Sequence, residues 1–461
     1  MAEEREVSIF GTDGVRDRAG EGFLAPESVA KISRALASVL QDREEFSPDI
    51  GAERGQAVYI GRDTRASGPE LLKQLSAGLL VAGFDACDLG ILPTPGIAEV
   101  ARVAPECCLA IVLSASHNPA GDNGIKLLSS AGAKVSDALE AEVSRRFSED
   151  VKSDPASPGS LRDLSAEAFE LYADYLVSSC EGGLEGKKVF LDAANGAASS
   201  LAFEVFQRIG AEVRLMGGQP DGRNINDGCG ALHPDVLAGA VNESGFDIGF
   251  CFDGDADRMI PVSATGNVYD GDVVLALAGR HYQSAGKLPA KAVVGTVMSN
   301  IGLARSLGEA GIELLRTPVG DRSVFRQMRD GHHPVGGEQS GHIIFMDYSS
   351  TGDGILAAIR LMSFLREHEM DLDRGAAIMT RYPQVLKNVK VREKIELAEV
   401  AALSEVVASV EERLGDEGRV LLRYSGTEPL LRVMLEGPRQ DLVEELCDEI
   451  CRVVEGEIGT K

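Results

Sequence analysis

The feature that most constrains the fold is a pattern that recurs along the chain. A short run of β-branched or apolar residues is followed at once by a loop of Gly, Asp, Ser or Asn, and then by helix-like sequence. Unbroken apolar runs that alternate with helices are typical of buried strands in α/β sheets, and ligands bind beyond the carboxyl ends of such strands. The sequence therefore predicts an α/β fold with its chemistry in these loops. The runs and the loops that follow them are Val58–Ile60 before GRDTR, Leu109–Leu113 before SASHNP, Val189–Leu191 before DAANG, Ile248–Phe252 before DGDADR and Ala292–Val294 before GTVMSN.

Composition narrows the classes of partner. The 461 residues carry a net charge of −26, and only 5% of them are aromatic, with no Trp. An acidic chain repels nucleic acid and anionic membranes, and few aromatic side chains are present to stack on bases. We find neither an apolar run of about 18 residues nor a signal peptide, and the eight Cys form no C-x-x-C pair. We expect a cytoplasmic protein with no nucleic-acid or membrane partner.

The end of the chain differs in character from the rest. Residues 396–414 and 441–454 have the spacing of amphipathic helices, and they surround the strand-like runs Arg419–Leu422 and Arg432–Leu435. This arrangement predicts a small α+β domain at the C-terminus.

The sharpest chemical signal is the loop Asp253-Gly-Asp255-Ala-Asp257-Arg258. Three carboxylates at alternate positions of an extended loop can converge on one hard cation such as Mg²⁺ or Ca²⁺. The spacing does not fit an EF-hand, because Arg258 stands where that loop needs Gly. An acidic surface turn is the alternative, but the preceding IGFCF run predicts that the loop leaves a buried strand.

A second loop, Ser114-Ala-Ser116-His117-Asn118-Pro119, places a hydroxyl beside an imidazole after a strand. Such a Ser is a candidate nucleophile, although no G-x-S-x-G elbow indicates a hydrolase. A turn in which Asn-Pro starts a helix is the alternative. Lys126 follows shortly after this loop.

Two further loops have the composition of ligand cradles. Residues 423–429, RYSGTEP, combine a guanidinium, hydroxyls and a Gly, which are the parts of a phosphate site. Residues 336–342, GGEQSGH, offer polar groups to hydroxyls. Each also fits an ordinary turn. FGTDGVR, residues 10–16, and GRDTR, residues 61–65, are anion-binding or structural loops by the same criteria.

The five motifs FGTDGVR, SASHNP, DGDADR, GGEQSGH and RYSGTEP, in this order, resemble those of the α-D-phosphohexomutase superfamily over nearly the whole chain. Gln339, TPVGDR, STGDGI and SGTEPLLRVMLEG look most like the bacterial branch that acts on glucosamine phosphates. The resemblance implies three similar α/β domains and a smaller α+β C-terminal domain around a central cleft. We place them at residues 1–165, 166–266, 267–378 and 379–461.

The resemblance implies that glucosamine 6-phosphate and glucosamine 1-phosphate interconvert through a phosphorylated Ser116 and a sugar 1,6-bisphosphate, which supplies UDP-N-acetylglucosamine synthesis. One Mg²⁺ would be held by Ser116, Asp253, Asp255 and Asp257. Whether the protein forms a homodimer is left open by the sequence. The catalytic residues implied are Ser116, Lys126, Arg16, His117 and Arg258. The substrate-binding residues implied are Glu338, Ser340, His342, Arg423, Ser425, Gly426, Thr427 and Arg432.

The chain departs from the family pattern at three positions: Ala256 replaces a Gly, Tyr424 a Pro and Ser350 a Thr. Ala256 would harm the metal loop only if that residue needs a positive φ. Two alternatives remain open. One is a phosphomannomutase or phosphoglucomutase, and the other is a catalytically silent sugar-phosphate-binding protein.

Overall fold

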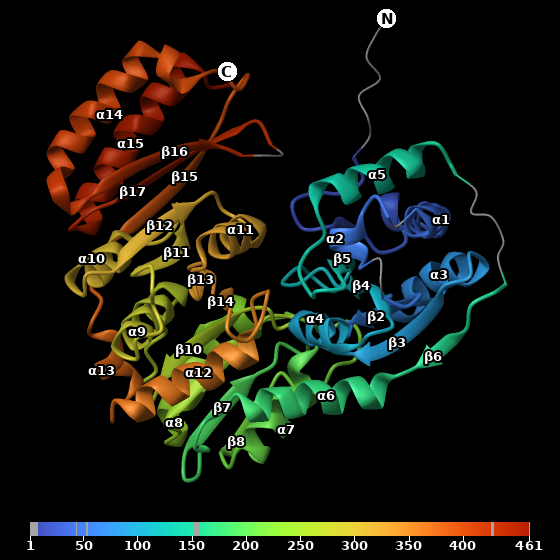
Figure 1. Ribbon diagram of the computed structural model, residues 1–461. Coiled ribbons are helices and arrows are strands. Elements are labelled where there is room, and N and C mark those ends of the chain that lie inside the picture. Colours follow the sequence, from blue (N-terminus) through green and yellow to red (C-terminus); the bar gives the residue numbers. More distant parts are fainter. Residues whose placement is uncertain (1–7, 43, 52–53, 152–156, 426–427, 461) are drawn as a thin grey trace, which may run out of the picture.

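The computed structural model describes residues 8–42, 44–51, 54–151, 157–425 and 428–460. Within them the chain forms four units, each built on its own β-sheet. In Figure 1 the first unit and the C-terminal unit stand opposite each other, and the second and third units join them below. The three α/β units and the smaller C-terminal unit agree with the predicted fold class, while the exact residue at which each unit ends stays a prediction.

The first unit has a six-stranded sheet in the order β1-β5-β4-β2-β3-β6. The central strands β2, β3 and β4 are parallel, as their apolar runs predict, and β5 returns antiparallel to β4. The strands are β1 (Val15–Arg18), β2 (Ala57–Arg62), β3 (Asp85–Ile91), β4 (Cys107–Leu113), β5 (Asp122–Ser129) and β6 (Leu161–Asp163). The helices are α1 (Pro26–Gln41), α2 (Ser47–Ile50), α3 (Gly68–Val81), α4 (Thr94–Val103) and α5 (Asp137–Ser148).

The second and third units each have a four-stranded sheet, in the orders β10-β9-β7-β8 and β12-β11-β13-β14. In each sheet three strands are parallel and one edge strand, β10 or β14, pairs antiparallel. The second unit contains α6 (Ser165–Ser178), β7 (Lys188–Asp192), α7 (Ala198–Arg208), β8 (Glu212–Met216), α8 (Pro234–Ser244), β9 (Ile248–Phe252) and β10 (Met259–Ser263). The third contains α9 (Gly271–Ser284), β11 (Ala292–Thr296), α10 (Ile301–Glu309), β12 (Glu313–Thr317), α11 (Asp321–Gly331), β13 (Val335–Gly337), β14 (Ile343–Phe345), α12 (Gly354–Glu367) and α13 (Leu372–Ala376).

The C-terminal unit is an antiparallel sheet in the order β15-β17-β16, with two helices on one face (Figure 1). Its apolar core is separate from those of the other units. The predicted strands and helices are confirmed here, with helix ends that differ by a few residues. The elements are β15 (Gln384–Lys390), α14 (Ala401–Leu414), β16 (Arg419–Tyr424), β17 (Leu430–Glu436) and α15 (Gln440–Glu457).

The apolar strands and the cysteines are buried as the sequence predicts. The strands β4 and β9 are buried along their whole length, which is what their unbroken apolar runs predict. Seven of the eight Cys are buried and the eighth, Cys180, is half-buried, so they serve as small apolar side chains. In the part of the chain that the structure describes, no helix combines the length and the apolar character needed to cross a membrane.

Candidate active site

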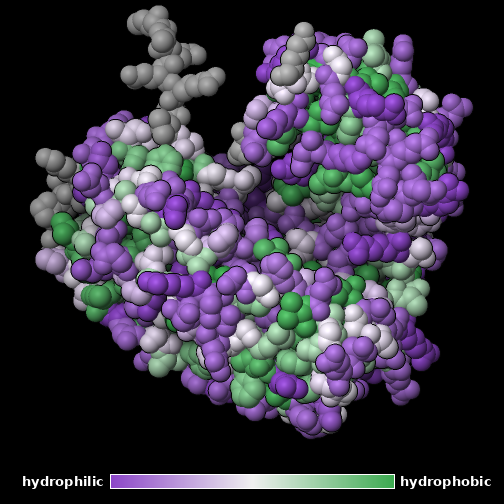
Figure 2. Space-filling model, turned by 180° about the vertical axis from the view of Figure 1, so that it is seen from behind, coloured by the Kyte–Doolittle hydropathy of each residue, from purple (hydrophilic) through white to green (hydrophobic). Residues whose placement is uncertain are grey.

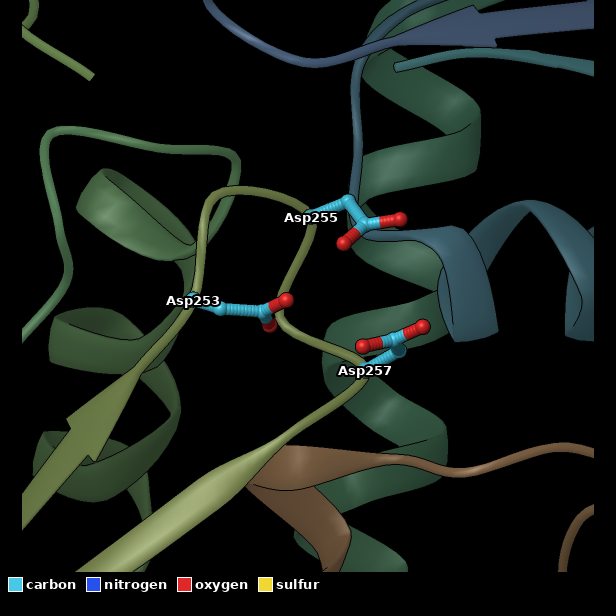
Figure 3. A group of neighbouring side chains, drawn as sticks. All are labelled: Asp253, Asp255 and Asp257. Carbon is cyan, nitrogen blue, oxygen red and sulfur yellow. The ribbon is translucent and has the colours of Figure 1, made fainter. Parts of the chain in front are cut away.

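The acidic loop connects β9 to β10, and it brings Asp253, Asp255 and Asp257 together (Figure 3). One oxygen from each carboxylate lies within 4.8 Å of the others, and all three residues are buried. Buried carboxylates that converge in this way repel one another unless a cation neutralises them. The loop is therefore a candidate metal site, and it is not an acidic surface turn, because its three aspartates are buried.

The oxygens of this trio fit a divalent cation. Asp255 Oδ1 and Asp257 Oδ1 are buried and, within the described residues, have no hydrogen-bond partner. Burial, together with the neighbouring charges of Asp257 and Asp255, raises the pKa of Asp253 well above its usual value. Oxygen-only ligands with unsatisfied lone pairs are what Mg²⁺ or Ca²⁺ would use.

Ala256 occupies the position at which the family pattern has Gly, and its φ is 54°. It therefore does adopt the left-handed backbone that favours Gly. The turn is nevertheless held by backbone hydrogen bonds. Ala256 donates its N–H to the Asp253 carbonyl at 3.0 Å, and its own carbonyl accepts from Gly354 N at 3.0 Å. Surrounding contacts thus hold the turn with an Ala in place.

Ser116 lies in the loop after β4, and its hydroxyl points at the acidic loop. Ser116 Oγ is 2.7 Å from Asp253 Oδ2 and 3.3 Å from His117 Nδ1. Its side chain is 1% exposed, and its φ is 51°. The contact joins the first and second units, and it places a nucleophilic oxygen directly on the carboxylate trio.

Cationic side chains surround this contact. Lys126 Nζ, on β5, lies 2.9 Å from Asp255 Oδ2 and 3.5 Å from Asp13 Oδ2. Burial opposes its charge, but the carboxylates of Asp13, Asp255 and Asp257 outweigh burial and raise the pKa of Lys126. Lys126 is therefore an ammonium at neutral pH.

Two guanidiniums complete this cationic set. Arg16 pairs with Asp13 and approaches Asn118 Oδ1 at 3.5 Å. Arg258 Nε lies 3.7 Å from Asp257 Oδ1. The Nε atoms of Arg16 and Arg258 are buried and lack a hydrogen-bond partner in the described residues, so each can still bind an anionic oxygen.

The pKa values of the two histidines of the predicted site shift in opposite directions. Burial and the charges of Arg258 and Arg16 lower the pKa of His117 to about 4, so its imidazole is neutral at pH 7. Burial also opposes protonation of His342, but Asp257, Asp321 and Glu338 outweigh it and raise the pKa of His342 to about 9. His342 Nδ1 lies 3.6 Å from Asp257 Oδ2, which links the sugar loop to the metal loop.

The predicted sugar loop spans the end of β13 and the start of β14. Glu338 Oε1 accepts from Gly320 N at 3.0 Å, so this loop is tied to the TPVGDR segment before α11. Ser340 is exposed. Gln339 Nε2 is buried, and the Gln339 amide faces the carboxylate of Asp270. The loop therefore carries polar side chains of which one, Ser340, is exposed to solvent.

The predicted phosphate loop follows β16 in the C-terminal unit. Arg423 and Arg432 are directly opposite each other in the β16–β17 pair, although like charges in that position repel. Burial and the charge of Arg432 lower the pKa of Arg423. Ser425 is buried, and its Oγ accepts from Glu428 N at 3.4 Å. Gly426 and Thr427 lie outside the described residues. Two opposed guanidiniums beside a hydroxyl suit a dianionic phosphate.

The molecule has a polar recess on the face seen in Figure 2. Figure 2 shows a deep recess between the C-terminal unit and the first unit, and the surface around it is largely hydrophilic. Such a recess suits a polar small molecule better than an apolar one.

Several residues at the site were not predicted as functional. Thr94, at the start of α4, donates its hydroxyl to Asp255 Oδ2 at 2.6 Å. Lys134 binds Asp13 and also Asp321 of the third unit, the latter at 2.7 Å. Asp13 lies inside the FGTDGVR motif, which could have identified it, whereas no sequence signal marks Thr94 or Lys134.

Four family models match the chain in order. They describe phosphoglucomutase/phosphomannomutase alpha/beta/alpha domains I, II and III and the C-terminal domain, over residues 7–154, 170–266, 270–382 and 386–453. Together they cover most of the chain. The chain therefore belongs to the phosphoglucomutase/phosphomannomutase family, whose fold and site define a phosphohexomutase.

Curated relatives define the branch. A phosphoglucosamine mutase of Desulforudis audaxviator is 45% identical over 454 residues, which covers 97% of this chain and 98% of the relative. One of Bacillus subtilis is 42% identical over 453 residues, covering 98% and 99%. These relatives place the chain among the phosphoglucosamine mutases, which are isomerases.

Solved structures share the fold. A phosphoglucomutase/phosphomannomutase family protein from Burkholderia thailandensis superposes with a TM-score of 0.81 at 25% identity, covering 98% of this chain and 99% of that one. Aspergillus fumigatus N-acetylphosphoglucosamine mutase, solved with GlcNAc-6P and magnesium, superposes with a TM-score of 0.66 at 17% identity, covering 98% and 96%. The second likeness concerns the fold alone.

Proposed function

We propose that this chain interconverts glucosamine 6-phosphate and glucosamine 1-phosphate by means of a phosphoryl group carried on Ser116. The observation that carries the proposal is the 2.7 Å contact between Ser116 Oγ and Asp253 Oδ2, inside a buried trio of carboxylates and among Lys126 and two guanidiniums. Phosphoryl transfer depends on positioning and charge neutralisation more than on covalent chemistry, and this set of groups supplies both.

In the first half-reaction the bond between Ser116 Oγ and phosphorus breaks, and a bond forms between phosphorus and O1 of glucosamine 6-phosphate. The proton lost by the O1 hydroxyl is the one that Ser116 Oγ gains, so the half-reaction balances. Lys126 is protonated and is the candidate acid, and neutral His117, 3.3 Å from Ser116 Oγ, is placed to relay the Ser116 proton. The second half-reaction returns the 6-phosphoryl group to Ser116 from the 1,6-bisphosphate.

The cation site fits this role. Asp253, Asp255 and Asp257 would hold Mg²⁺ together with an oxygen on Ser116, and the bound ion would neutralise charge on the transferred phosphoryl group. Arg16 and Arg258 would bind phosphoryl oxygens through the nitrogens that now lack partners.

Recognition of the rest of the substrate is assigned to the other two loops. Glu338, Ser340 and His342 would bind the sugar hydroxyls or the amino group. Arg423, Ser425 and Arg432, with Gly426 and Thr427, would hold the phosphate that is not reacting. One such cradle serves both half-reactions, because the bisphosphate carries a phosphate at either end.

A turnover assay tests this function. Purified protein with Mg²⁺ is given glucosamine 6-phosphate, glucose 6-phosphate and mannose 6-phosphate, each with a trace of the matching 1,6-bisphosphate. We expect the largest kcat/KM for glucosamine 6-phosphate. Faster turnover of glucose or mannose phosphate would move the chain to the phosphoglucomutase or phosphomannomutase activity, and no turnover of any of them would make it a binding protein.

A further inference from the structure

The GRDTR segment after β2 has no role in the chemistry above, yet it contains a fully buried ion pair. The side chains of Arg65 and Asp63 are both 0% exposed, and Arg65 Nε donates to Asp63 Oδ2 at 2.9 Å. A buried pair of this kind is costly to form, which invites the question of what it does. Its remaining contacts all lead to the loop that carries Ser116.

Arg65 uses every N–H of its guanidinium. Besides the bond to Asp63, Nη2 donates to the carbonyls of Ser116 at 3.0 Å and Asn118 at 2.8 Å. Nη1 donates to the carbonyl of Asp122 at 2.9 Å and to that of Pro119. A guanidinium offers five N–H groups in a planar fork, and here four of them bind backbone carbonyls of one seven-residue stretch, 116–122. Lysine has no such fork.

Asp63 holds the backbone N–H of Ser116 through Ser114. Its Oδ2 accepts from Ser114 Oγ at 2.6 Å, and Ser114 Oγ in turn accepts from the Ser116 N–H at 2.9 Å. The backbone N–H and carbonyl of Ser116 are therefore both held by the Asp63–Arg65 pair, the first through Ser114 and the second directly. The Ser116 hydroxyl itself contacts Asp253 and His117 and not the ion pair.

Ser116 needs such support because its backbone is strained. Its φ of 51° lies in the left-handed region, which is unfavourable for a residue with a β-carbon. The second unit adds two contacts to this loop, because Asn226 Nδ2 donates to the carbonyls of Ser116 at 2.9 Å and Asn118 at 3.1 Å. A relaxed loop would turn the hydroxyl away from Asp253.

We infer that Arg65 and Asp63 are positioning residues, which lock the Ser116 loop in its strained conformation and so keep the phosphoryl-carrying oxygen on the metal loop. This inference rests on the proposed function. A reacting atom displaced by about 1 Å can cost about 100-fold in rate, so loss of the lock is expected to act on kcat.

The test compares Arg65→Lys with Arg54→Lys. Arg54 is a matched control, because it also donates to three backbone carbonyls, those of Ala101, Arg102 and Ala104, but in a part of the first unit away from Ser116. Both variants keep the charge and lose the fork. Each is assayed for kcat and KM, for thermal stability, and for the ³¹P resonance of its phosphoserine.

We expect Arg65→Lys to lower kcat about 100-fold with little change in KM, and to shift or broaden the phosphoserine resonance. Arg54→Lys is expected to keep kcat within about threefold and the resonance unchanged. If Arg65→Lys retains kcat within threefold of the unmodified protein, or if both variants lose activity in proportion to stability, the inference is wrong. Absence of turnover in the unmodified protein would instead refute the proposed function.

Ser114→Ala provides a milder second variant in case Arg65→Lys does not fold. It removes the link from Asp63 to the Ser116 N–H and leaves the buried ion pair intact. We expect a fall in kcat of about 5- to 30-fold with unchanged KM and a broadened phosphoserine resonance. Unchanged kcat and an unchanged resonance would overturn the role of this link.

Discussion

Ser116 Oγ and Asp253 Oδ2 lie 2.7 Å apart, although 137 positions separate them in the sequence and they belong to different sheets. The contact fixes where the Ser116 hydroxyl of the first unit meets the acidic loop of the second. Lys126, Arg16 and Arg258 gather around it because their own carboxylate partners, Asp255, Asp13 and Asp257, line the same space.

Replacement of one ligand carboxylate should separate metal binding from folding. Asp255→Asn keeps the shape and the acceptor for Thr94 but removes a charge, so Mg²⁺ binding should weaken and kcat should fall by about 100-fold or more. Saturating Mg²⁺ should raise the melting temperature of the unmodified protein and leave that of the variant nearly unchanged. Asp330→Asn, at an exposed position of α11, is the control and should behave as the unmodified protein. Normal activity of Asp255→Asn would mean that the acidic loop is not a metal site.

The turn at Ala256 should tolerate glycine better than a helix does. Ala256→Gly relieves the strain of φ 54°, which offsets the added entropy of the unfolded chain, so the free energy of unfolding should stay within about 1 kcal/mol of the original or rise. Ala357→Gly, at an equally buried position inside α12, should lower it by about 1 kcal/mol or more. Urea unfolding measures both. A larger loss at Ala256 than at Ala357 would contradict the strained turn.

Asp353 should make stability depend on pH. Burial raises its pKa from 3.8 to about 6. A carboxyl with a higher pKa in the folded state binds its proton more tightly there, so its contribution to stability is present below about pH 4 and is lost as pH rises through about 6. Asn has no proton to lose and can still accept from Leu356 N. The free energy of unfolding of Asp353→Asn, relative to the unmodified protein, should therefore rise by roughly 2–3 kcal/mol from pH 4 to pH 8.

Asp85 is the control, because its pKa is shifted in the opposite direction to that of Asp353. Hydrogen bonds from Ser160 lower its pKa, so its stabilising effect is lost only as pH falls below the ordinary value of 3.8. The relative stability of Asp85→Asn should change little between pH 4 and pH 8. A flat difference for Asp353→Asn over that range would show that Asp353 is not protonated in the fold.

Gln339 should contribute to the choice of sugar. It lies beside Glu338 in the sugar loop, and its buried amide faces the carboxylate of Asp270. Met can neither donate nor accept a strong hydrogen bond, so Gln339→Met should reduce the ratio of kcat/KM for glucosamine over glucose phosphate by about tenfold. Phosphorylation of Ser116 should persist. An unchanged ratio would exclude Gln339 from sugar discrimination.

The sequence predicted the parts of this molecule that depend on local pattern. Apolar runs such as Leu109–Leu113 and Ile248–Phe252 form buried strands, and the loops that follow them carry Ser116 and the three aspartates. The convergence of the three aspartates was expected from their spacing, whereas the meeting of the Ser116 loop with the acidic loop was expected only from the family resemblance. A contact across 137 positions has no local signature.

The residues that sequence reasoning missed act through long-range contacts. Thr94 has no signal in its own segment, and Arg65 lies in GRDTR, which the sequence marked only as an anion-binding or structural loop. Their contacts with Asp255 and with the Ser116 carbonyl appear only in the fold. Charge state is a second property that the motif could not give. His117 and His342 each lie in a polar loop that follows a strand. Arg258 helps to lower the pKa of His117, whereas Asp257 helps to raise the pKa of His342.

The central claim is tested most directly by following the phosphoryl group itself. Protein labelled with ³²P at Ser116 is mixed with excess glucosamine 6-phosphate and Mg²⁺ in a single turnover. We predict that the label leaves the protein and appears in glucosamine 1,6-bisphosphate and then in the monophosphates, faster than with glucose 6-phosphate, and that Ser116→Ala takes up no label. Label that stays on the protein, or that maps to Ser114, would contradict the account.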